Sequence, residues 1–84
     1  MVEFALCKKG NTPEEVEDWK YTTIQIMLED GFELPIVSDL TLDPNVRAIG
    51  LYFRCDESKF VQLLLNTNLV IDQTTRGIHF MKSV

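Results

Sequence analysis

The sequence predicts an α+β domain: a small, mainly antiparallel sheet of four to six strands with one or two helices packed on one face. Several short stretches alternate between apolar and polar residues with the period of a strand. Two other stretches carry a helix-capping residue followed by apolar positions three and four apart. A chain of 84 residues is long enough for one ordinary domain but not for two, so we expect residues 1–84 to form a single domain.

The chain opens with a strand and continues into a helix. Val2, Phe4 and Leu6 fall on one face of an alternating stretch, which is typical of a half-buried strand, and residues 8–11 predict the turn that ends it. Thr12 is then an N-cap residue, with a proline at the first helical position and acidic residues beside the positive end of the helix dipole. A helix therefore begins after Thr12.

Residues 21–28 allow two interpretations. In the favoured one, the helix ends near Trp19 or Lys20 and residues 21–28 form a strand, because β-branched residues alternate along them. Residues 29–31 then form a hairpin turn. The returning strand carries Phe32, Leu34 and Ile36 on one face.

In the competing interpretation, the helix continues through residue 28 and Gly31 lies beyond its C-terminus. Its inward residues are then Val16, Trp19, Thr23, Ile26 and Met27. The hairpin is favoured because this helix would leave three large apolar side chains outside its buried stripe, namely Tyr21, Ile24 and Leu28.

Pro35 predicts that the returning strand lies at a sheet edge or ends soon after, because proline cannot donate a ladder hydrogen bond. A connection follows over residues 38–46, in which residues 43–45 are typical of a type I turn. Residues 47–55 then alternate throughout and are the best candidate for a central strand. Gly50 within them predicts close packing over that face or a bend.

The rest of the chain predicts a second helix and a closing pair of strands. Asp56 caps the helix, Phe60, Leu63 and Leu64 point inward, and residues 66–68 end it. Residues 69–72 and 78–82 form the two strands, with a turn at residues 73–77 between them.

Composition and charge narrow the classes of function. The net charge is −5, and residues 1–43 carry −7 while the remainder carries +2. Such an acidic chain is a poor candidate for coating nucleic acid or lying on a membrane surface. Because we find no signal peptide and no apolar run of about 20 residues, we expect a cytoplasmic protein that does not enter membranes.

The residues that could carry out catalysis are few. His79, the single histidine, lies opposite Ile78 and Phe80 on a strand, so we expect a surface or rim position without a nucleophile beside it. Cys7 and Cys55 have neither redox nor zinc spacing and are expected to be buried free thiols, although a disulfide stays open if they lie on adjacent strands. We therefore expect no enzyme, no cofactor and no metal.

Two functional hypotheses remain. The favoured one is a non-enzymatic protein-interaction or regulatory module, either a homo-oligomer or an adaptor or inhibitor that presents its acidic N-terminal half. One variant imitates the charge of nucleic acid, a role suited to a small accessory protein of a phage or mobile element. Its candidate contact residues are Glu14, Glu15 and Asp18, together with Val61 and Leu65, an apolar shoulder on the second helix.

The alternative hypothesis is a small nucleic-acid-binding regulator. An aromatic side chain for base stacking and nearby basic side chains for phosphate are the combination that such proteins use. Its candidate residues are Arg47, Tyr52, Arg54 and Arg76. The identity of any partner does not follow from the sequence.

Overall fold

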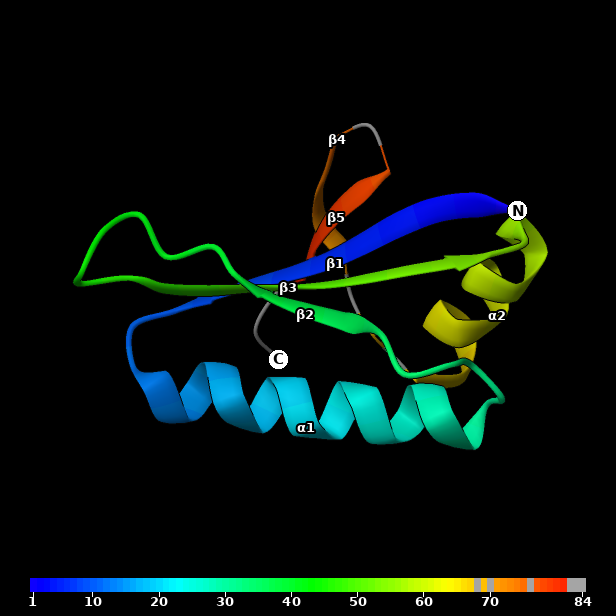
Figure 1. The fold of residues 1–84 in the computed structure, drawn as a ribbon, viewed down its shortest axis with the longest axis horizontal. Helices are drawn as coiled ribbons and strands as arrows, with labels where there is room; N and C mark the ends of the chain where they lie inside the picture. The colour runs from blue at the N-terminus through cyan, green and yellow to red at the C-terminus, as the bar shows by residue number, and fades with distance from the viewer. Residues whose placement is uncertain (68, 70, 76, 82–84) are drawn as a thin grey trace.

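The computed structural model describes residues 1–67, 69, 71–75 and 77–81, with only the backbone described for residues 67 and 72–75. The elements are β1 (Val2–Gly10), α1 (Pro13–Glu29), β2 (Ile36–Asp39), β3 (Arg47–Cys55), α2 (Glu57–Thr67), β4 (Ile71–Thr75) and β5 (Ile78–Met81). The strands form one five-stranded sheet in the order β2-β3-β1-β5-β4. Both helices lie on the same side of this sheet (Figure 1). The predicted α+β fold is therefore confirmed.

The central strand of the sheet is β1. It pairs antiparallel with β3 along its whole length, from Val2↔Cys55 to Gly10↔Arg47. The turn predicted at residues 8–11 is therefore wrong in part, because this ladder keeps residues 8–10 in the strand. On its other side β1 pairs in parallel with β5, whereas β2–β3 and β4–β5 are antiparallel. The sheet is thus mixed but mainly antiparallel.

Helix α1 continues to Glu29, so the favoured hairpin over residues 21–31 is wrong and the competing helix is correct. The Glu15 backbone N–H donates to Thr12 Oγ1 at 3.3 Å, which confirms the predicted N-cap. Gly31 lies just beyond the C-terminus with a φ of 85°, a left-handed conformation that glycine adopts without strain. The helix buries Val16, Thr23 and Met27 against the sheet.

The helix differs from the predicted hairpin because it leaves large apolar side chains in solvent, which the sequence pattern disfavours. Tyr21 is 66% exposed and Leu28 is 48% exposed on the outer side of α1, while Ile24 packs partly against the core. The protein thus exposes apolar residues that the sequence pattern predicted to be buried.

A cluster of aromatic rings forms the core between the sheet and the helices. Phe4 of β1 stacks on Phe60 of α2 with ring centroids 4.1 Å apart and planes within 5° of parallel. Phe53 of β3 lies beside both rings, and Phe32 meets Phe53 edge to face at 5.7 Å. Since α2 is held to the sheet by Phe60, this cluster fixes the position of the second helix.

The segment between α1 and β3 differs from its prediction in one respect. Phe32 is buried, but Leu34 and Ile36 are exposed, so these three side chains do not share a face. The strand itself begins at Ile36, directly after Pro35, and lies at the edge of the sheet as expected. The turn at residues 43–46 is confirmed by the hydrogen bond from the Val46 N–H to the Asp43 carbonyl.

The other strand and helix predictions are largely confirmed. Strand β3 has the predicted bounds, and Leu40 and Tyr52 pack closely over Gly50. The Asp56 carbonyl accepts from the N–H groups of residues 59 and 60 at the start of α2, where Phe60 and Leu63 are buried. The closing strand pair forms, but β4 runs over residues 71–75, so the turn predicted at residues 73–77 is too long. Arg76, Lys82 and residues 68 and 70 lie outside the described residues.

Candidate functional site

The acidic residues predicted to contact a partner lie in the first two turns of α1. Glu14 and Asp18 are exposed to solvent. Glu15 is exposed as well, but its carboxylate turns toward the end of β1, since Oε2 lies 3.0 Å from the position that a Cβ on Gly10 would occupy. Glu14 and Asp18 are therefore better placed than Glu15 to meet another molecule.

The single basic residue of α1 does not neutralise these carboxylates. Lys20 Nζ lies 2.7 Å from Glu17 Oε2 and 4.5 Å from the centroid of the Tyr21 ring. The hydrogen bond that Lys20 donates to the Glu17 carboxylate raises the pKa of Lys20, so this amine stays charged. Lys20 is thus engaged within the helix, and Glu14 and Asp18 keep their negative charge unopposed by it.

A continuous stripe of exposed side chains runs along the outer side of α1. We define the outer stripe as the exposed residues at spacings of three and four: Glu14, Asp18, Tyr21, Gln25 and Leu28. It combines acidic residues at one end with two large apolar side chains. Such a stripe contributes nothing to the core of the domain.

The apolar shoulder identified on α2 is exposed and not buried within the domain. Val61 is 47% exposed and Leu65 is 73% exposed, and the two residues are one turn apart on the helix. We refer to this pair as the α2 shoulder. Within the described residues the domain leaves it open to solvent.

The residues of the nucleic-acid hypothesis do not form one surface. Tyr52 and Arg54 share the sheet face opposite the helices, as predicted. Arg47 lies five residues from Tyr52 and seven from Arg54, on the helix-covered side of β3, where its guanidinium is 3.6 Å from Asp39. Arg76 lies outside the described residues. The structure therefore separates Arg47 from the other two.

His79 does not lie at the surface or rim, so that prediction is wrong. It is 9% exposed, with its ring centroid 4.7 Å from that of Phe60 and 5.8 Å from that of Phe4. The parallel pairing of β5 with β1 places His79 beside Leu6 on the helix-covered face. Burial lowers its pKa from the usual value of 6.5. The imidazole is therefore part of the core.

The two cysteines are buried free thiols, as expected. Although they lie on adjacent strands, Cys7 pairs with Gly50 and Cys55 pairs with Val2, so they are five positions apart and point to opposite faces of the sheet. This separation is too large for a disulfide. Burial raises the pKa of both thiols, which makes the reactive thiolate form rarer.

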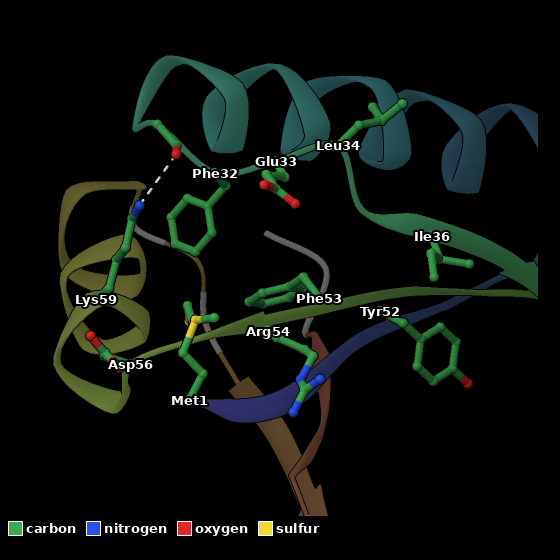
Figure 2. A pocket seen from close by; sticks show the side chains of 12 residues that line it. Met1, Phe32, Glu33, Leu34, Ile36, Tyr52, Phe53, Arg54, Asp56 and Lys59 are labelled. Atoms are coloured by element: carbon green, nitrogen blue, oxygen red, sulfur yellow. Dashed lines mark hydrogen bonds between the residues drawn. The ribbon is translucent and has the colours of Figure 1, made fainter.

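A groove of about 610 Å³ opens beside the end of β3, and the sequence did not predict it. Its floor consists of the buried residues Phe32, Phe53 and Cys55. Around the floor lie exposed apolar and charged side chains, several of which Figure 2 shows pointing around the opening. These are Met1, Glu33, Leu34, Ile36, Arg54 and Asp56. The signal in the sequence was Pro35, which directly precedes the first residue of β2 that pairs with β3.

Comparison with known proteins adds no relative to these observations. No protein-family description, curated protein or solved structure matches the chain. Among the described residues, no three or more histidine, cysteine, aspartate or glutamate side chains are grouped to hold a metal ion. No helix in the part of the chain that the structure describes is long and apolar enough to span a membrane. The surfaces of the domain are therefore the remaining indication of its function.

Proposed function

We propose that this protein acts by binding, as a non-enzymatic interaction module that presents the outer stripe of α1 to a basic surface on a partner protein. The observation that supports this is the composition of the stripe itself. Tyr21 and Leu28 are large, exposed and unused by the core, and Glu14 and Asp18 extend the same line of side chains. Aromatic anchors beside charged residues are typical of protein interfaces.

The two parts of the stripe have different roles in this proposal. Glu14 and Asp18 attract the partner and orient it, because opposite charges raise the association rate and fix the register of a complex. Tyr21 supplies binding energy, because a ring buried at the centre of an interface is worth more than a charge at its rim. An adaptor or an inhibitor of a basic protein would both use the stripe in this way.

The test compares two double charge reversals that change the net charge equally. Glu14→Lys/Asp18→Lys acts on the stripe, and Asp43→Lys/Glu57→Lys acts on exposed acidic residues elsewhere, so each takes the chain from −5 to −1. Partners captured from a native lysate are quantified for both variants and for the unchanged protein. We expect the first variant alone to lose specific partners. Equal loss or equal retention by the two variants would refute the role of the stripe.

The salt dependence of binding separates the contribution of the acidic residues from that of Tyr21. Binding of the captured partner to the unchanged protein should weaken as salt increases, since an electrostatic contact is screened beyond about 10 Å at 0.1 M ionic strength. Tyr21→Ala should weaken it by about 1 kcal/mol or more while leaving the salt dependence unchanged. Salt-independent binding would contradict the electrostatic part of the proposal.

Self-association through the α2 shoulder is the second candidate, favoured by the exposure of Val61 and Leu65. A symmetric dimer places such a patch against its own copy, which buries both apolar surfaces. Molar mass measured in solution over a range of concentrations tests this. A mass that stays monomeric throughout, or a dimer that Leu65→Glu leaves intact, would exclude the shoulder as its interface.

A further inference from the structure

The groove beside β3 exists because two neighbouring strands differ in length. Strand β3 has nine residues and pairs with β1 throughout, whereas β2 has four residues. The β2–β3 ladder stops at Ile36↔Tyr52. Beyond that point, residues 53–55 have a strand partner on one side and the groove on the other.

The backbone of Arg54 points into this opening. Ala48 shows which side each residue of β3 faces: its N–H donates to Thr41 Oγ1 at 3.1 Å and its carbonyl accepts from the Leu40 N–H at 3.0 Å, both on the β2 side. Every second residue of a regular strand directs its N–H and C=O to the same side. Since β3 pairs with β1 without a bulge, Arg54 faces the β2 side too, where the ladder has already ended.

The groove has a wall on each side. One wall is the end of β3, and the other is the segment of residues 31–36, which runs from the end of α1 into β2 (Figure 2). Between them, Phe32 and Phe53 form an apolar floor. A strand that is still part of a sheet cannot enter between two walls, so a second copy of this domain does not fit there by edge pairing. A single extended segment carries no such neighbouring strand.

The charged side chains at the groove differ in whether they already interact with other parts of the domain. Lys59 Nζ donates to the Gly31 carbonyl at 3.3 Å and lies 4.6 Å from the centroid of the Phe32 ring. Arg54 is exposed and forms no ion pair with any described residue. Glu33 and Asp56 lie elsewhere along the lining and disfavour an acidic ligand group near themselves. An acidic group therefore fits best beside Arg54.

We propose that the groove binds one extended segment of a partner polypeptide, which adds to the edge of β3 at Arg54. The segment places an apolar side chain over Phe32 and Phe53 and an acidic side chain near the Arg54 guanidinium. An unpaired backbone N–H and C=O in one groove are complementary to another peptide backbone, as in β-strand addition. The groove shares no residue with the outer stripe of α1, so the two sites can be tested independently.

A designed peptide tests the proposal directly. The probe is a nine-residue peptide of alternating valine and threonine with one central glutamate, blocked at both ends and labelled with fluorescein. Fluorescence anisotropy should show saturable binding with a Kd below about 1 mM. In amide NMR spectra, shifts should be confined to residues 31–36 and 53–55, with slower exchange of the Arg54 N–H. No saturation, or shifts that map to α1, would overturn the proposal.

Two matched controls identify the interactions. Methylation of alternate backbone nitrogens in the peptide removes its hydrogen-bond donors to β3 and should weaken binding about tenfold. Arg54→Gln should weaken binding of the glutamate peptide about fivefold but leave a glutamine version of the peptide unaffected. If methylation has no effect, or if Arg54→Gln affects both peptides equally, strand addition at Arg54 is wrong.

A pair of leucines supplies the control for the apolar wall. Leu34 lines the groove at 69% exposure, and Leu42 is 99% exposed outside it, so serine at either position leaves the core intact. Leu34→Ser should weaken peptide binding several-fold, and Leu42→Ser should not change it. Equal effects of the two substitutions would contradict binding in the groove.

Discussion

Removing the Phe60 ring tests the packing of α2 most directly. The side chain is 4% exposed and contacts three rings: Phe4 at 4.1 Å, His79 at 4.7 Å and Phe53 at 6.1 Å between centroids. Replacing a buried phenylalanine with alanine costs about 3–5 kcal/mol in unfolding free energy. Because aromatic pairs add about 0.5–1.5 kcal/mol beyond the buried area, we expect Phe60→Ala to lie near the top of that range.

This loss is large relative to the whole domain. A stability of about 0.05–0.15 kcal/mol per residue gives about 4–13 kcal/mol for 84 residues. Urea denaturation followed by circular dichroism, with Trp19 fluorescence as a second probe, measures the change. The matched control is Leu65→Ala on the same helix, which is 73% exposed and should change stability by no more than about 0.5 kcal/mol. A loss below about 1 kcal/mol for Phe60→Ala would show that α2 does not pack on the sheet as described.

Three further predictions concern single positions. Gly31→Ala should lower the unfolding free energy by about 1–2 kcal/mol, because φ is 85° there, and a urea midpoint equal to that of the unchanged protein would contradict it. Burial lowers the pKa of His79, so as the pH decreases below 6.5 the unfolded chain takes up the proton before the folded chain does. The free energy of unfolding should therefore decrease as the pH decreases, by at most about 1.4 kcal/mol per pH unit, until the pKa of the folded protein is reached. His79→Leu should lose that part of the pH dependence, and an unchanged slope would argue against burial. Cys7 and Cys55 should react with a thiol reagent at least about tenfold more slowly in the folded protein than in urea, and equal rates would show that they are accessible.

Residues 21–28 show why the fold class could be predicted while one element could not. Their β-branched residues alternate, but the same residues also place Thr23 and Met27 four apart, on one side of a helix. The local pattern is therefore compatible with both structures, although it favours the hairpin. The choice is made by the sheet, whose helix-covered face receives Val16, Thr23 and Met27. Such a tertiary contact is not encoded in the periodicity of the segment itself.

Strand β5 illustrates a second limit. Its alternation was identified correctly, and His79 does lie opposite Ile78 and Phe80. Which face is covered by helices depends on the pairing with β1, where Leu6 lies beside His79. Hydrophobicity alone favours Ile78 and Phe80 as the inward pair, and those two are only partly buried in the structure. When a strand carries apolar residues on both faces, the buried face can therefore be predicted only if the register with the neighbouring strand is known.

The candidate site was predicted in part for the same reason. The prediction that Glu14 and Asp18 lie on a helix is confirmed, and both are exposed. The excess of apolar residues on α2 is equally compatible with a helix buried on two sides, and the structure decides for exposure of Val61 and Leu65. The groove depends on where the β2–β3 ladder ends, and the sequence marks that point only through Pro35. A site formed by the absence of pairing leaves little signal in composition or spacing.

The open face of the sheet is a weaker binding surface than its lack of a helix suggests. Ala5 and Cys7 at its centre are 3% and 2% exposed, because the large side chains on neighbouring strands cover them. Tyr52 packs over Gly50, and Lys9 lies 5.1 Å from the centroid of the Phe80 ring. The outer stripe, the α2 shoulder and the groove each expose apolar side chains instead. Of these three, the groove alone adds a directed backbone N–H and C=O, so a ligand bound there would be fixed in register as well as attracted.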